Sequence, residues 1–196
     1  MGYTTDFSGE LTLSKPLTEG QQRYYDDWSQ TRRVKRDVSK LQEQYDGNYS
    51  LDGDYGTEGE YFGYVPSEVR KNYEETHDWT GSGYGDWISG HTEESQVSEL
   101  DGNKPPSTQP GLWCGWEIKD DTLQWDGSEK FYHYQEWLQY VIDNFMERWD
   151  ISLDGEVKWT GEDDGDIGKI VVTENQIEVQ HPEDLEDEVT YNPSWS

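Results

Sequence analysis

A hydrophobic stripe in residues 111–149 constrains the fold more than any other feature. Its members are Phe131, Tyr134, Leu138, Val141, Phe145 and Trp149. Apolar side chains at three- and four-residue steps lie along one face of an α-helix. Such a face has to be buried, so we expect an amphipathic helix packed against a sheet.

Strands are expected on both sides of this helix, because alternating apolar residues are typical of half-buried strands. Before the helix, alternation is found from Tyr3 to Leu13 and from Leu112 to Ile118, and the chain turns at Lys119–Asp121 into a return strand with Leu123 and Trp125. After the helix, three more strands are expected, around residues 157–159, 167–172 and 177–179.

Two capping boxes indicate where helices begin. Thr18 and Gln21 open a first helix that we expect to end near Arg33, and Asp126 with Glu129 opens the amphipathic helix. The predicted order is β-α-long loop-β-β-α-β-β-β. The fold class is therefore α+β, an antiparallel sheet with two helices packed on one face.

Aromatic residues have to supply most of the core. Only 31% of the 196 residues are hydrophobic, but the chain contains 10 Trp, 14 Tyr and 4 Phe, and each aromatic side chain buries a large area. We expect one α+β domain over residues 1–181 with a long loop excursion at 41–110. Residues 182–196 are expected to form an acidic mobile tail.

The net charge of −28 is distributed unevenly. Residues 1–40 hold seven Lys or Arg and six Asp or Glu, so residues 41–196 carry −29. A surface of this kind repels nucleic acid and anionic membranes and attracts cationic partners. We expect a protein partner with a basic surface, no direct nucleic-acid binding and no membrane contact, and leave the oligomeric state open.

The basic residues gather in one place. Residues 31–40 contain the cluster Arg32, Arg33, Lys35 and Arg36. One interpretation is a structural hub that neutralises nearby carboxylates. The other is an anion or phosphate site, because the guanidinium fork suits oxyanions.

The excursion at residues 41–110 is rich in Gly and Tyr and has fifteen acids against three bases. Tyr-, Trp- and Gly-rich loops make adaptable contacts with partners; the alternative is a solubilising decoration. The candidate partner-binding residues are Tyr49, Tyr55, Tyr61, Trp79, Tyr84 and Trp87.

Metal and thiol chemistry are weaker hypotheses. Asp163, Asp164 and Asp166 are candidates for a divalent-cation site, against the ordinary alternative of an acidic, solvated hairpin turn. Cys114 lies between tryptophans on a predicted core face, so we expect a buried small side chain rather than a reactive thiol. We expect no cofactor.

Several blocks of the sequence resemble a family of uncharacterised proteins from tailed phages, prophages and various bacteria. The blocks are GYTTDFSGELTLSKPLT, TRRVKRD, QPGLWCGWEI, LQWDGSEKFYHYQEWLQYVI and LDGEVKWTGEDDGDIGKIVV. They lie within about the first 36 and the last 90 residues, and the excursion is not covered. The resemblance implies a viral or mobile-element context and assigns no activity or site residue.

We therefore expect a virus-associated, non-catalytic accessory protein that binds a host or viral macromolecule, as a host-defence inhibitor or nucleic-acid mimic does. A single cysteine and an N-terminus without a signal-peptide pattern favour the cytoplasm, which is the host cytoplasm if a virus encodes the chain. The alternatives are a salt-adapted or virion-associated structural protein, and an enzyme or phosphate-binding protein that uses Arg32, Arg33, Lys35 and Arg36. The sequence has no Walker loop, HExxH or GxSxG motif, which disfavours an enzyme.

Overall fold

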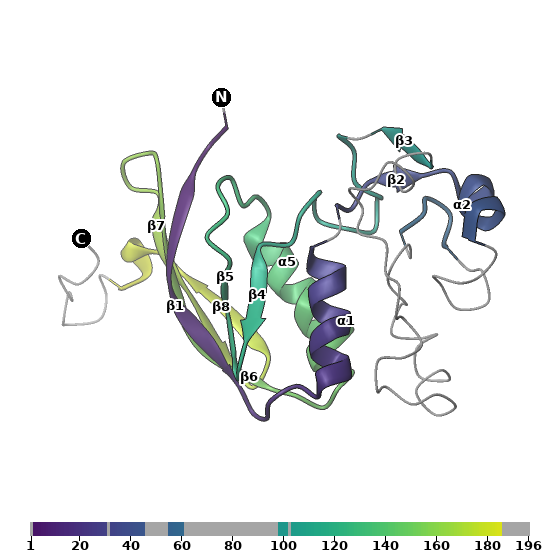
Figure 1. The fold of residues 1–196 in the computed structure, drawn as a ribbon. Coiled ribbons are helices and arrows are strands. Elements are labelled where there is room, and N and C mark those ends of the chain that lie inside the picture. The colour runs from purple at the N-terminus through teal and green to yellow at the C-terminus, as the bar shows by residue number, and fades with distance from the viewer. Residues whose placement is uncertain (1, 31, 46–54, 61–97, 102, 186–196) are drawn as a thin grey trace.

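A sheet of six antiparallel strands forms the centre of the molecule (Figure 1). The computed structural model describes residues 2–30, 32–45, 55–60, 98–101 and 103–185. The strand order is β4-β5-β1-β6-β7-β8, so the N-terminal strand lies in the interior of the sheet. The bounds are β1 Thr5–Leu13, β4 Trp116–Lys119, β5 Thr122–Trp125, β6 Leu153–Gly161, β7 Ile167–Thr173 and β8 Gln176–Gln180.

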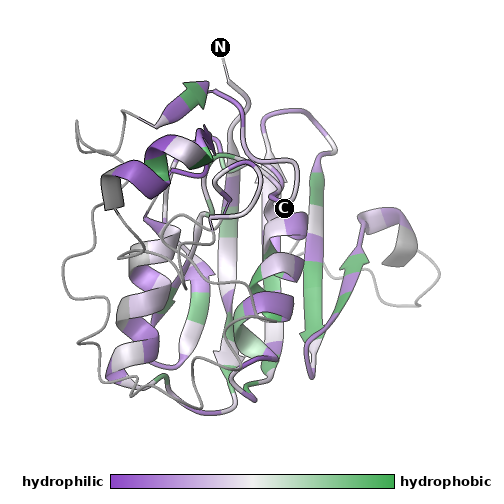
Figure 2. Ribbon diagram, turned by 90° about the vertical axis from the view of Figure 1, so that its right-hand side faces the viewer, coloured by the Kyte–Doolittle hydropathy of each residue, from purple (hydrophilic) through white to green (hydrophobic). Residues whose placement is uncertain are grey.

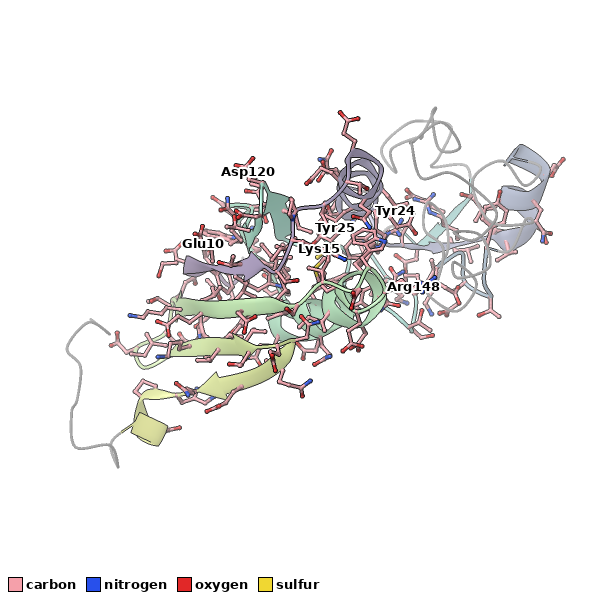
Figure 3. All side chains as sticks on the ribbon, turned by 90° about the horizontal axis from the view of Figure 1, so that it is seen from below. Glu10, Lys15, Tyr24, Tyr25, Asp120 and Arg148 are labelled. Atoms are coloured by element: carbon pink, nitrogen blue, oxygen red, sulfur yellow. The ribbon has the colours of Figure 1, made fainter. Side chains whose placement is uncertain are left out.

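Two helices lie on the same side of this sheet (Figures 1 and 3). They are α1, Glu19–Ser29, and α5, Tyr134–Val141, which a π-helical turn over Ile142–Met146 extends. The capping box at Thr18 and Gln21 forms as predicted. The predicted α+β fold, an antiparallel sheet with helices on one face, is confirmed.

The space between helices and sheet is filled largely by aromatic rings. Trp28 of α1 lies 4.5 Å from the ring of Phe145 and stacks on Tyr140, and Trp116 and Trp137 are also completely buried. The hydropathy colouring shows apolar and polar residues alternating along the strands (Figure 2). Aromatic rings thus supply much of the core, together with aliphatic side chains such as Leu11, Leu123 and Ile170.

The amphipathic helix begins later than its predicted capping box. Asp126 accepts a hydrogen bond from the backbone N–H of Ser128, which forms a local turn, and α5 begins only at Tyr134. Positive φ angles at Lys130 and His133 interrupt any helix between these points. Phe131 still reaches the core, because its ring packs where a side chain on residue 115 would otherwise lie and that residue is glycine.

A smaller unit lies beyond α1, on the side away from the sheet (Figure 1). It contains β2, Lys35–Arg36, α2, Val38–Tyr45, and β3, Glu99–Asp101, and β2 pairs with β3 in a two-stranded sheet. The expected long excursion at residues 41–110 therefore begins within α2 and contains β3, which pairs with β2 at residues 35–36. The C-terminal segment includes the short 3₁₀ helix Pro182–Leu185, and the rest of the predicted tail lies outside the described residues.

Candidate functional site

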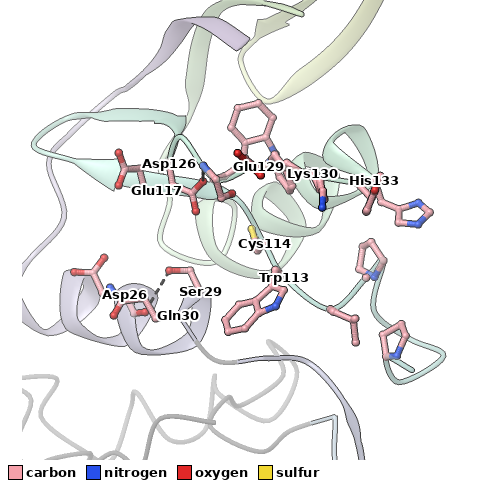
Figure 4. A pocket seen from close by; sticks show the side chains of 18 of the residues that line it. Asp26, Ser29, Gln30, Trp113, Cys114, Glu117, Asp126, Glu129, Lys130 and His133 are labelled. Carbon is pink, nitrogen blue, oxygen red and sulfur yellow. Dashed lines mark hydrogen bonds between the residues drawn. The ribbon is translucent and has the colours of Figure 1, made fainter. Parts of the chain in front are cut away.

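A cleft of about 1010 Å³ opens between α1, β4 and the loop that precedes α5 (Figure 4). We call it the α1–β4 cleft. Three segments line it, and its lining residues are Asp26, Ser29, Gln30, Asn103, Pro105, Pro110–Glu117 except Gly115, Ile118, Lys119, Asp126 and Ser128–His133. Pockets for small ligands usually range from about 300 to 1,000 Å³, so this cleft is at the upper end of that range.

Exposed aromatic rings form part of the cleft wall. Trp113 is 39% exposed and Tyr132 is 48% exposed, whereas almost all other large apolar side chains among the described residues are more deeply covered. Trp113 lies three residues before β4, outside the strand. Its neighbour Cys114 and the first strand residue Trp116 are buried, whereas Trp113 is partly exposed in the lining of the cleft.

Two carboxylates from distant parts of the sequence line the cleft. Asp26 of α1 accepts a hydrogen bond of 2.9 Å from the side chain of Gln22. Burial raises the pKa of Asp26, and the negative charge of Glu117 adds to this effect. Asp126 accepts its hydrogen bond from a backbone N–H, that of Ser128, at 2.9 Å.

Two lysines, Lys119 and Lys130, line the cleft. Lys119 lies 3.0 Å from the carboxylate of Glu117, which also accepts a hydrogen bond from Gln124. Lys130 extends toward the start of the chain, where a side chain on Gly2 would collide with it. Glu117 is therefore compensated, whereas Asp26 and Asp126 form no ion pair among the described side chains.

The floor of the cleft contains the only cysteine. Cys114 is buried, and burial raises the pKa of its thiol to about 12. Next to it, the Tyr25 hydroxyl donates a hydrogen bond of 2.7 Å to the carbonyl of Trp116, and burial raises the pKa of Tyr25 well above its usual value. The expectation that Cys114 is a buried side chain is confirmed.

One buried donor lies at the edge of the cleft. Trp137 is 0% exposed, and its indole N–H has no acceptor among the described residues. A Cβ on Gly111, a lining residue, would lie 3.3 Å from the indole nitrogen and 3.5 Å from His133, with no other atom within 4 Å outside the neighbouring residues. A side chain at residue 111 would therefore contact this N–H closely, and the N–H is covered in this structure.

The basic cluster lies in and next to the two-stranded sheet and not in the cleft. Lys35 pairs with Glu58 at 2.6 Å, and Arg36, which is 1% exposed, lies 3.7 Å from Glu99. Arg33 is buried, and Arg32 donates a hydrogen bond to Asn103. These contacts favour the structural hub over the anion-binding interpretation.

The predicted partner-binding residues fall mostly outside the described part of the chain. Tyr49, Tyr61, Trp79, Tyr84 and Trp87 lie in the ranges that are not described. Tyr55 is described and is 0% exposed. Tyr55 is therefore a core residue of the smaller unit, because a completely covered ring contacts no partner, and the interpretation as a surface contact is corrected.

The candidate metal residues do not assemble a coordination site. Asp166 accepts hydrogen bonds from the Tyr3 hydroxyl and, at 3.0 Å, from the Trp159 indole. Within the described residues, no group of three or more His, Cys, Asp or Glu side chains is arranged to hold a metal ion, and this includes Asp163 and Asp164. The carboxylate of Asp166 instead ties the β6–β7 turn to the start of the chain.

The sequence did not predict the α1–β4 cleft as a site. The alternation of residues 112–118 contained a signal for Trp113, because Trp113 is out of phase with Cys114, which lies on the predicted core face. No local pattern marks Asp26 as a cleft residue. The other carboxylates of the cleft, such as Glu117 and Asp126, lie about one hundred residues further along the chain.

Comparison of the chain with models of protein families, with curated proteins and with solved structures gives no significant match. In the part of the chain that the structure describes, no helix combines the length and the apolar character needed to cross a bilayer.

Proposed function

We propose that this protein is a non-catalytic, acidic accessory protein that binds the basic surface of a partner protein. The observation that carries the proposal is the α1–β4 cleft, whose lining includes Asp26, Asp126 and the partly exposed ring of Trp113. Concave surfaces with a few polar groups among aromatic side chains are the usual form of a binding site.

The charge balance of the chain supports a cationic partner. Asp and Glu number 43 against 15 Lys and Arg, and several of the bases are engaged in internal ion pairs. These are Lys35, Arg36, Lys104, Lys119 and Lys169. A field of this sign accelerates encounter with basic surfaces and disfavours acidic ones.

A viral or prophage origin is part of the proposal, and the host cytoplasm is the corresponding location. Its support is the resemblance of the sequence blocks given above to proteins of tailed phages and prophages. An accessory protein of this kind acts by occupying a host protein, and a surface rich in carboxylates competes for sites that receive nucleic acid.

The test is capture of the partner followed by a binding titration of the two purified proteins. The tagged chain is recovered from the cells in which it is naturally made, and the captured protein is identified. Calorimetry at about 0.05 and 0.5 M NaCl then measures Kd, and we expect at least tenfold weaker binding at the higher concentration, where screening acts within about 4 Å. An acidic partner, or a Kd that salt leaves unchanged, contradicts the proposal.

The same salt series examines the salt-adapted alternative. A chain whose charge serves recognition keeps its near-ultraviolet circular dichroism in dilute buffer, since the aromatic core does not depend on counterions. Unfolding at low salt with recovery in molar salt favours salt adaptation instead.

A further inference from the structure

We propose that the α1–β4 cleft binds an arginine side chain within an extended basic segment of the partner protein. The inference rests on the proposed function and names the chemical group that this function recognises. It is carried by three features of the cleft: the carboxylates, the exposed rings and the volume.

The carboxylates of the cleft determine the sign of the charge that a ligand should carry. Among the described residues, Asp26 and Asp126 accept hydrogen bonds from the neutral donors Gln22 and the Ser128 backbone, and they line the cleft from different segments. A cation placed between α1 and the loop before α5 is attracted by these two carboxylates, whereas an anion is repelled by them.

The other ionisable groups of the lining do not reverse this preference. Lys119 is paired with Glu117, and the aliphatic part of Lys130 lies against the N-terminal segment near Gly2. Glu129 contributes another carboxylate to the same loop, and His133 lies at its end (Figure 4).

The rings favour arginine over lysine. Trp113 and Tyr132 are partly exposed at the cleft wall. A guanidinium group is planar, stacks on aromatic faces and binds carboxylates through two parallel hydrogen bonds, and it is less strongly hydrated than an ammonium group. An arginine therefore uses both the ring of Trp113 and the carboxylates.

The size of the cleft indicates that the ligand is a peptide segment rather than an isolated cation. A cleft of about 1010 Å³ accommodates the side chain together with neighbouring backbone.

The first experiment compares defined peptides by calorimetry with the full-length chain. The probes are acetyl-Gly-Arg-Gly-Arg-Gly-amide and its citrulline and lysine analogues. Citrulline has nearly the shape of arginine but no charge. We expect the arginine peptide to bind at least tenfold more tightly than the citrulline peptide and severalfold more tightly than the lysine peptide. Equal binding of the arginine and citrulline peptides overturns the inference.

The second experiment compares cleft variants with matched controls elsewhere on the surface. Trp113→Ala is expected to weaken the arginine peptide about fivefold, and Asp26→Asn with Asp126→Asn about tenfold. Leu100→Ala truncates an exposed apolar residue outside the cleft, and Asp164→Asn removes a carboxylate of the β6–β7 turn. Control variants that weaken binding as much as the cleft variants contradict a site in the cleft.

Failure of the inference is distinguishable from failure of the proposed function. If the captured partner is basic and salt-sensitive but binds the cleft variants with wild-type Kd, the proposed function stands and the cleft is not the site. If the arginine peptide binds the cleft but the captured partner has no basic surface, the proposed function fails while the chemistry of the cleft is retained.

Discussion

The β6–β7 turn and the α1–β4 cleft both present carboxylates next to tryptophan, but they use them in opposite ways. In the turn, Asp166 is held by the Tyr3 hydroxyl and the Trp159 indole. In the cleft, Asp26 and Asp126 are held by neighbours within their own segments and face a hollow. The turn sequence is the more acidic of the two, so the density of acids along the chain does not identify a binding site. The partners of each carboxylate do.

The largest effect is expected at the floor of the cleft and concerns Cys114. Burial raises the pKa of its thiol from 9.0 to about 12, and each unit lowers the thiolate fraction tenfold. Alkylation by iodoacetamide at pH 8 should therefore be about a thousand times slower in the folded protein than in urea. Rapid alkylation of the folded chain would show that the Cys114 thiol is accessible from the cleft and would contradict its assignment as a buried side chain.

The next largest effect concerns the free energy of unfolding. It distinguishes the structural carboxylate of the β6–β7 turn from the carboxylates of the α1–β4 cleft. Asp166→Ala leaves the indole N–H of the buried Trp159 without its acceptor, and we expect a loss of about 1–3 kcal/mol in the free energy of unfolding. Asp164→Ala, in the same turn but exposed, is the control and should change it by less than about 0.5 kcal/mol. Urea denaturation measures both variants, and equal losses would show that Asp166 is not a structural carboxylate.

A third prediction concerns Glu58, which is engaged within the fold as Asp166 is. The hydrogen bond from Lys35, together with those from Ser107, lowers the pKa of Glu58 from 4.5 to about 2. The stabilisation by its charged form is therefore complete above pH 4.5 and is lost as the pH falls toward 2. Glu58→Gln should be less stable than the wild type at pH 7, and the difference should shrink between pH 4.5 and 2.5. A difference that is independent of pH contradicts the role of this ion pair.

The smallest effect is expected at Asp26, on the cleft side of the comparison. Burial raises its pKa, so the folded state disfavours the charged form, and stability falls as the pH rises through the pKa of Asp26 in the folded protein. Asp26→Asn keeps an acceptor for Gln22 and removes the charge. We expect equal or slightly greater stability at pH 7, by less than about 1 kcal/mol, in urea denaturation. A clear loss of stability would place Asp26 with Asp166 as a structural carboxylate.

Local patterns predicted much of the fold. Alternation identified β1 and the β4–β5 hairpin, the capping box located the start of α1, and the aromatic stripe identified α5. The start of α5 was misplaced because Lys130 and His133 adopt positive φ angles that no local signal marks. The β2–β3 pair was missed since its two short strands lie more than sixty residues apart in the sequence.

The cleft was much less predictable than the fold. Exposure of Trp113 agrees with the alternation of residues 112–118 in the sequence, but the position of Asp26 near Glu117 depends on how α1 packs against β4. The basic cluster was conspicuous in the sequence, yet its members Lys35 and Arg36 are occupied by Glu58 and Glu99. Clustering in the sequence shows where charges are, and only the pairing shows which of them remain available.

The sequence by itself determined that an aromatic core joins an antiparallel sheet to amphipathic helices, because periodicity and capping are properties of adjacent residues. The tertiary structure decided which carboxylates are engaged and where a hollow remains. Electrostatic and packing interactions act over a few ångströms of space, and Asp26 and Asp126 line the same cleft although one hundred residues separate them.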